Sequence, residues 1–272
     1  MLKKLMKYEW KTIRNVLLVI NAFTVFSTIL GVIAMHNLAF GKNTGEPFPN
    51  LVAVLLFMVY YATIIGVSFA MTVYIAVRFY RNLYTDEGYL MHTLPVTSRQ
   101  LVLSKLIVHS GCLMLTTALI YISVCSLIVP FIISLENEFA SFSQMASALL
   151  EECRDIFGLS VPRLLLCTIT TLGISTISGV LSIYCSVSLG QMFRKHKIMG
   201  SILCYIAILC LIQTLSTILL MPQMISSMSG GRLNMEIYFK SVFLTTGVIS
   251  MFLGIIFYLV TLHLMSKKLN LD

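Results

Sequence analysis

The chain has 272 residues, of which 58% are hydrophobic and only 11% are charged, and its formal net charge is +8. Ordinary soluble domains carry about 25% charged residues, so this composition excludes a soluble globular protein of the usual kind. The charges lie in short islands between long apolar runs. We therefore interpret the basic excess as a topology signal and an attraction to membrane lipids, not as a nucleic-acid-binding surface.

Six apolar runs are long enough to cross a bilayer, because a hydrocarbon core of about 30 Å requires about 20 helical residues. The strict alternation of a barrel strand does not occur in them. We predict an all-α polytopic membrane protein with one membrane domain over residues 1–272. Lys and Arg concentrate in alternate loops, which predicts that both termini lie in the cytoplasm. The predicted spans cover residues 16–39, 51–77, 106–135, 161–189, 198–221 and 241–265.

Residues 1–15 are predicted to form an amphipathic elbow helix that leads into the first span. Leu5 and Ile13 recur on one face, whereas Lys4 and Lys11 recur on another. Such a helix is typical of the membrane interface. The simpler alternative is a basic flank that only sets the orientation of the first span. That span lacks a small-residue cleavage site, so we expect it to be retained as an anchor.

Residues 78–105 form a long polar interruption between the second and third spans. Thr85 can cap a short helix whose first turn holds Asp86 and Glu87, where negative charge is favourable against the helix dipole. The helix is predicted to stop before Pro95, because the residue before a proline is disfavoured in helical geometry.

A second helix start follows in the same stretch. Thr97 and Gln100 match a capping box, which predicts that the third span begins as a helix there. The short helix before it has an apolar surface suited to a groove on a soluble partner, and the alternative is a loop that merely reverses the chain. The apolar residues of that surface are Tyr89, Leu90, Met91 and Leu94.

Two predicted outer segments differ in character. Residues 136–160 have an apolar stripe that includes Phe142, Leu149 and Ile156, which predicts an amphipathic helix lying on the bilayer or covering the exit of a pathway. Residues 222–240 are predicted to form a flexible turn or a short re-entrant excursion.

The fourth span carries small residues at helical spacing along one face. In lipid such residues allow helix backbones to approach closely, so the stripe predicts tight packing either within the subunit or between subunits. Its members are Ser175, Gly179, Ser182, Ser186 and Gly190.

The apolar runs show no sign of chemistry within the membrane. No acidic or basic residue lies deep in a predicted span, and His36, His109 and His263 are interpreted as interfacial or locally satisfied. No motif for a metal site, a hydrolase or a phosphate-binding loop is found, and the seven cysteines are interpreted as packing residues. We therefore predict that the chain is not an enzyme and holds no cofactor, so any ATP hydrolysis belongs to another polypeptide.

Residues 78–96, RFYRNLYTDEGYLMHTLPV, closely resemble the cytoplasmic loop of permease subunits in bacterial ATP-binding-cassette exporters of the type-2 permease class. Many Firmicutes members carry a DEGYL-x-x-TLPV core there. The resemblance implies that two permease copies, identical or different, assemble with two ATPase subunits that bind ATP and Mg²⁺. It also implies a coupling helix seated on the ATPase and a second cytoplasmic contact nearby. The residues so assigned are Thr85, Asp86, Glu87, Gly88, Tyr89, Leu90, Met91, His92, Leu94 and Pro95, then Arg194, Lys195, His196 and Lys197.

The cargo follows less directly. An apolar pathway without buried charge suits amphipathic or hydrophobic cargo, and the resemblance favours cytolytic or antimicrobial peptides, with drugs and lipids as competitors. It also implies the bacterial plasma membrane as the location. The rival hypothesis is a non-transporting immunity or sensor protein that binds a peptide or lipid. An intramembrane enzyme is disfavoured because the required polar constellation is missing.

Overall fold

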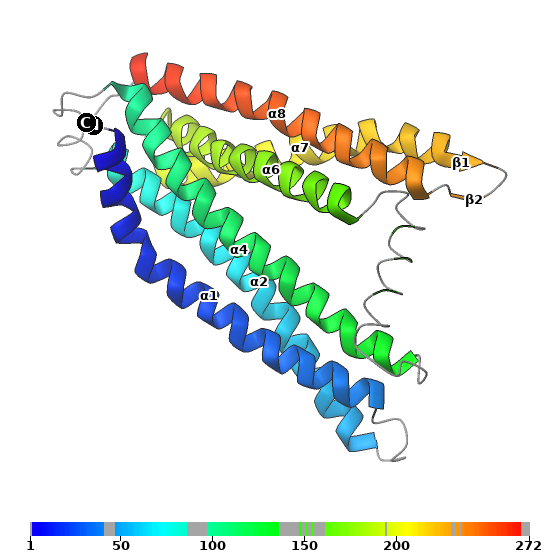
Figure 1. The fold of residues 1–272 in the computed structure, drawn as a ribbon. Coiled ribbons are helices and arrows are strands. Elements are labelled where there is room, and N and C mark those ends of the chain that lie inside the picture. The colour runs from blue at the N-terminus through cyan, green and yellow to red at the C-terminus, as the bar shows by residue number, and fades with distance from the viewer. Residues whose placement is uncertain are drawn as a thin grey trace. The chain divides into compact units, whose positions relative to one another are not determined.

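The structure is a computed structural model, and six long α-helices make up most of its described part (Figure 1). It describes residues 2–40, 47–85, 97–135, 161–193, 195–229, 232–233 and 235–267, with Ser147, Glu151 and Arg154. All six are long and apolar enough to cross a membrane, which confirms the six predicted spans. They are α1 (Leu2–Phe40), α2 (Pro47–Tyr84), α4 (Ser98–Leu135), α6 (Val161–Gly190), α7 (Lys197–Ser227) and α8 (Met235–Lys267).

The chain folds into two compact units. Unit 1 contains residues 1–3, 75–110 and 146–272, and unit 2 contains residues 4–74 and 111–145. Unit 2 therefore holds nearly all of α1 with the first part of α2 and the last part of α4. Unit 1 holds the end of α2, the start of α4, and α6, α7 and α8.

The helix α1 is continuous from Leu2, so the predicted amphipathic segment and the first span belong to one helix. Ile13 and Leu17 are buried on one side, and Lys7 and Arg14 are exposed on the other. This confirms the predicted amphipathic pattern. Glu9 also lies on the buried side, with only 6% of its surface exposed. An interfacial orientation of this segment stays a prediction.

Hydroxyl groups join the three helices of unit 2. Tyr60 of α2 and Ser123 of α4 share a hydrogen bond of 2.8 Å, and Thr28 of α1 is 2.8 Å from the same Ser123 oxygen. Thr28 also donates to the carbonyl of Thr24. Gly31 lets the Tyr60 ring approach, because a Cβ there would lie 2.8 Å from the ring. Packing and hydrogen bonds of this kind hold helices together where the hydrophobic effect gives no preference for protein over lipid.

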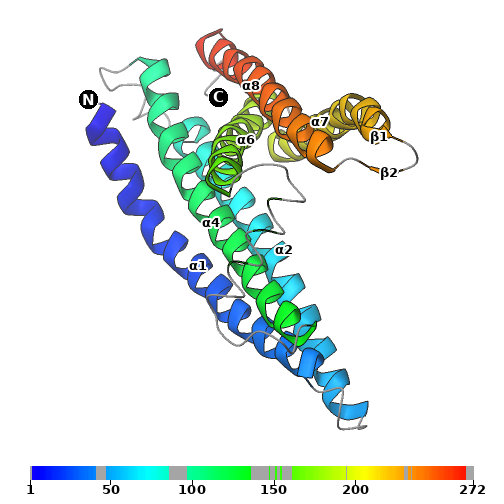
Figure 2. The same cartoon turned by 45° about the vertical axis from the view of Figure 1, so that its right-hand side comes forward.

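In unit 1, α6 packs against both α7 and α8. Figure 1 shows α6 alongside α8, and Figure 2 shows the same helices turned by 45°. Residues 180–188 of α6 are buried on every face, in contrast to the exposed faces of most spans. Small residues form the contact with α8: a Cβ on Gly254 would lie 3.6 Å from Ser178. These contacts make the C-terminal half of α6 the packing centre of unit 1.

The segment between α7 and α8 is shorter than predicted. The helix α7 continues through Pro222 to Ser227, and α8 already begins at Met235. Between them β1 (Met228–Ser229) pairs antiparallel with β2 (Arg232–Leu233). A proline is tolerated in a membrane helix where other groups satisfy the carbonyl that it leaves without a partner. The prediction of a loop starting at residue 222 was therefore wrong.

The predicted outer helix over residues 136–160 falls mostly outside the described residues. Ser147, Glu151 and Arg154 are helical and exposed, at spacings of four and three residues. That spacing places the three on one helix face. The rest of the segment stays a prediction.

Candidate functional site

Of residues 78–96, which resemble an exporter coupling loop, only residues 78–85 are described. Residues 86–96 lie outside the described residues, so the coupling assignments from Asp86 to Pro95 stay predictions. The preceding helix α2 ends at Tyr84 and the following helix α4 begins at Ser98. The structure therefore shows what holds the flanks of this segment.

The two threonines predicted as helix caps are both described. The hydroxyl of Thr85 donates to the carbonyl of Arg81 at 2.5 Å, so it takes part in the last turn of α2. The amides that it was predicted to cap lie outside the described residues. The backbone N–H of Gln100 donates to the Thr97 hydroxyl at 3.4 Å, which confirms Thr97 as the cap of α4.

A buried aromatic cluster joins α2 and α4 to α6. The Phe79 ring of α2 stacks on the Tyr184 ring of α6, with centroids 3.8 Å apart and planes 9° apart. The Tyr184 hydroxyl shares a hydrogen bond of 2.5 Å with Nδ1 of His109 on α4. All three side chains are fully buried. His109 therefore has a hydrogen-bond partner at Nδ1, and Tyr184 is the partner that the sequence did not identify.

A second contact holds the last turn of α2. The Tyr84 hydroxyl donates to Ser188 of α6 at 2.9 Å, and the Tyr84 ring meets the edge of Phe79 at 6.2 Å. Tyr184 and Ser188 lie one turn apart on the same face of α6. That face of α6 therefore contacts α2 at two positions, Tyr184 and Ser188. Tyr184 also contacts α4. We call Phe79, Tyr84, His109, Tyr184 and Ser188 the anchor cluster.

The predicted second cytoplasmic contact lies between α6 and α7. Lys195 and His196 are exposed there, whereas Arg194 lies outside the described residues. The carbonyl of His196 accepts the N–H of Gly200 at 2.9 Å, which starts α7. Exposure leaves both side chains accessible to a partner, and their role stays a prediction.

The predicted small-residue stripe of α6 divides into two parts. Ser182 and Ser186 are buried, and a Cβ on Gly190 would lie 2.5 Å from the backbone nitrogen of Ser201. Ser175 is half-buried, while Gly179 is exposed and a Cβ there would meet nothing within 4 Å. Among the described residues of this chain, close packing involves the C-terminal part of the stripe, and packing between subunits stays a prediction.

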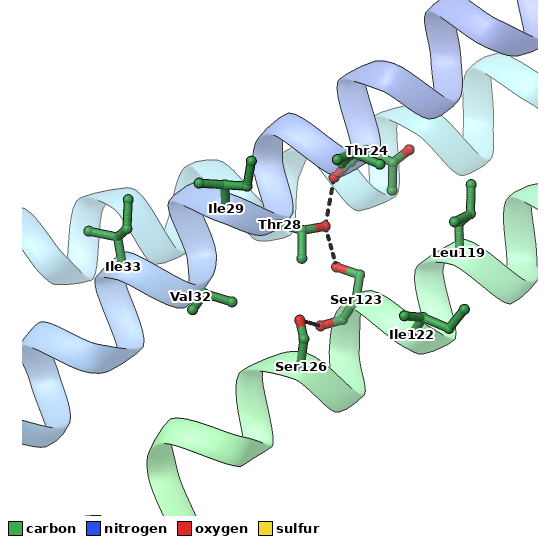
Figure 3. Close-up of a pocket in the computed structure, with 10 residues that line it drawn as sticks. Thr24, Thr28, Ile29, Val32, Ile33, Leu119, Ile122, Ser123 and Ser126 are labelled. Atoms are coloured by element: carbon green, nitrogen blue, oxygen red, sulfur yellow. Dashed lines mark hydrogen bonds between the residues drawn. The ribbon is translucent and has the colours of Figure 1, made fainter.

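A groove of about 400 Å³ lies between α1 and α4 within unit 2 (Figure 3). This volume falls within the range of about 300–1,000 Å³ that is usual for small-molecule sites. Thr28 and Ser123 point toward each other across it, and Ser126 bonds back to the carbonyl of Ser123. The described residues that line the groove include no charged side chain: six are aliphatic, among them Ile29 and Ile122, and four carry a hydroxyl. The groove therefore suits an apolar occupant.

The described residues contain no group of His, Cys, Asp and Glu side chains that could hold a metal ion. No protein-family model matches this chain, and no curated protein and no solved structure matches it either.

Proposed function

We propose that the chain is the permease subunit of an ATP-driven bacterial exporter. It works with a separate ATP-binding-cassette ATPase subunit and a second permease copy, in the plasma membrane, with both termini in the cytoplasm. ATP and Mg²⁺ bind to the ATPase subunit, and residues 85–95 form the coupling helix that contacts it. Lys195 and His196 contribute the second contact.

One observation carries this proposal. The Arg78–Val96 sequence pattern of an exporter coupling loop begins in the last turns of α2 and ends just before α4, and both helices are long enough to span a membrane. The anchor cluster supports it further, because it fixes the helices on both sides of this pattern to a third spanning helix. A segment that transmits force requires such a fixed base, whereas a passive connection between spans does not.

The coupling assignment is tested by co-purification. The chain is produced with candidate ATP-binding-cassette ATPases, and Glu87→Arg, Tyr89→Ala and Leu90→Ala are compared with wild type. We expect each variant to lose complex formation and coupled ATP turnover, because an interface depends on a few buried anchor residues. Glu151→Arg, at an exposed acidic position on the predicted outer side, serves as the matched charge-reversal control. Unchanged turnover in all three variants refutes the coupling assignment.

The proposed cargo is an amphipathic or hydrophobic molecule, and cytolytic or antimicrobial peptides are the first candidates. The groove of unit 2 supports an apolar cargo, since uncharged side chains line it. Proteoliposomes that contain the complete transporter are expected to move a fluorescent amphipathic peptide only when ATP is present.

The groove also favours the rival function, an immunity or sensor protein that binds a peptide or lipid without transport. That function requires no ATPase. Cells that express this chain alone distinguish the two: full peptide resistance without an ATPase supports the rival, and resistance that depends on the ATPase supports the exporter.

A further inference from the structure

The two helices that flank residues 86–96 are held at different distances from that segment. Tyr84 is the last residue of α2 and bonds to Ser188, so α2 is fixed at its end. His109 lies 11 residues after the start of α4 at Ser98, which corresponds to about 16 Å of helix rise. The segment is therefore separated from the anchor cluster by almost no helix on the α2 side. On the α4 side about 16 Å of helix lies between them.

Tyr184 is the side chain common to both helices. Its ring face contacts Phe79 of α2, and its hydroxyl bonds to His109 of α4. Offset or parallel ring contacts and buried hydrogen bonds fix both position and orientation, which aliphatic packing alone does not. Movement of either flanking helix is thus resisted by the same residue of α6.

From Tyr184 the contacts continue into the rest of unit 1. Ser178, six residues before Tyr184 in the same helix, contacts Gly254 of α8. At the other end of the buried stretch, Gly190 packs against the backbone of Ser201 in α7. Because α6 is buried on every face over residues 180–188, it cannot shift without moving these neighbours.

We propose that Tyr184 is a positioning residue that fixes both helices flanking residues 86–96 to α6, so that displacement of this segment moves α6 together with α7 and α8. This inference rests on the proposed exporter function. It adds to that function the helix that receives the force, and it identifies the side chain through which the force passes.

The test measures movement of α6 at a position far from the mutated residue. Cys167 lies on α6, 17 residues before Tyr184, or about 26 Å along the helix. A chain that retains Cys167 as its single cysteine is assembled with the ATPase in proteoliposomes. Maleimide labelling of Cys167 is measured with and without ATP trapped on the ATPase, together with complex formation and ATP turnover.

The variants separate the two contacts of Tyr184. Tyr184→Phe removes the bond to His109 and keeps the ring stack, whereas Tyr184→Leu removes both. Tyr205→Phe, at a half-buried tyrosine of α7, is the matched control for loss of a hydroxyl. Loss of one hydrogen bond of about 1 kcal/mol changes an equilibrium about five-fold. We therefore expect the ATP-dependent change in labelling to fall about five-fold in Tyr184→Phe, further in Tyr184→Leu, and not in Tyr205→Phe, with complex formation kept.

The outcomes distinguish the inference from the function on which it rests. If wild type forms no complex with the ATPase, the proposed function fails. If wild type is coupled but Cys167 does not respond to ATP, or if Tyr184→Phe responds as wild type does, the function stands and the role of Tyr184 is refuted. Should Tyr184→Leu fail to fold, Tyr184→Phe and Phe79→Leu still decide the question, because each removes a different contact of the same ring.

Discussion

The two units hold their helices together by different means. In unit 1, large rings and a histidine join α2, α4 and α6 through the anchor cluster. In unit 2, a series of hydroxyls from Tyr60, Ser123 and Thr28 joins α2, α4 and α1. A Ser or Thr hydroxyl that loses its partner on another helix can bond to a carbonyl of its own helix instead. Ser126 shows such a bond, because its hydroxyl donates to the carbonyl of Ser123. A buried ring has no such alternative.

The two kinds of contact differ in how much free energy is lost when a contact is broken. Hydroxyl contacts between membrane helices are worth about 0.6 kcal/mol on average, because alternative partners are always close. Loss of a buried aromatic side chain costs about 3–5 kcal/mol, because the cavity is not refilled. We therefore expect unit 1, which carries the flanks of the proposed coupling segment, to be the stiffer unit. Unit 2, which carries the groove, can adjust its helix contacts at little cost.

The largest expected effect comes from the closest backbone approach in unit 1. In Gly190→Ala the new Cβ would lie 2.5 Å from the Ser201 nitrogen and 2.6 Å from its Cα, and backbone atoms cannot turn aside. We expect a loss of about 3 kcal/mol, at the upper end of overpacking costs. Gly179→Ala is the control from the same predicted stripe, and it should leave the thermal midpoint in detergent unchanged or raise it. Equal midpoints for both variants would contradict the packing of α6 on α7.

A smaller loss is expected at the closest approach in unit 2. In Gly31→Ala the new Cβ meets the Tyr60 ring at 2.8 Å, but a ring can rotate where a backbone cannot. We expect a loss of about 1–2 kcal/mol, part of it from the weakened bond between Tyr60 and Ser123. Gly66→Ala in α2, where a Cβ would meet nothing within 4 Å, is the control. A loss at Gly31 that equals the loss at Gly190 would refute the contrast between the two units.

Some features of the structure could be predicted from the sequence alone. The six spans follow from run length, and the start of α4 follows from Thr97 and Gln100, because both are local properties. The buried face of α1 was also predictable, and Glu9 falls in step with Leu5, Ile13 and Leu17 at intervals of four residues. That spacing was a signal that Glu9 is buried.

The remaining contacts depend on which helices meet, and a single sequence does not contain that information. Tyr184 stands 75 positions from His109, and its ring resembles any other apolar residue of the fourth span. For the same reason the small-residue stripe did not reveal which part packs within the chain: Ser182 and Ser186 are buried, whereas Gly179 is exposed, and packing between subunits stays a prediction. The end of α7 was predicted too early, because the helix continues through Pro222 to Ser227.

An intermediate effect tests the hydroxyl series itself. Ser123→Ala removes the contacts to both Tyr60 and Thr28, so we expect a loss of about 1 kcal/mol in the free energy of unfolding. In a double-mutant cycle with Tyr60→Phe, the coupling energy should be about 0.6 kcal/mol and below about 1.7 kcal/mol. Ser126→Ala, whose hydroxyl bonds only within α4 among the described contacts, is the control. A coupling energy as large as that between Tyr184 and His109 would show that the two units are equally stiff.

The smallest effect is expected for Gln223→Met, where α7 meets α8, and the loss of its partner in Thr245→Val should have a larger effect. The Gln223 side-chain amide donates to the Thr245 hydroxyl at 2.6 Å, while Oε1 of Gln223 is buried without a hydrogen-bond partner among the described residues. Gln223→Met removes a satisfied donor together with an unsatisfied acceptor, so its effect should lie within about 0.5 kcal/mol of zero. Thr245→Val instead leaves the buried amide with neither bond and should cost about 1–2 kcal/mol, because an unmade hydrogen bond costs more than an absent one. Unfolding of both variants in detergent measures this asymmetry, and a greater loss in Gln223→Met than in Thr245→Val would mean that a water or lipid group satisfies Oε1.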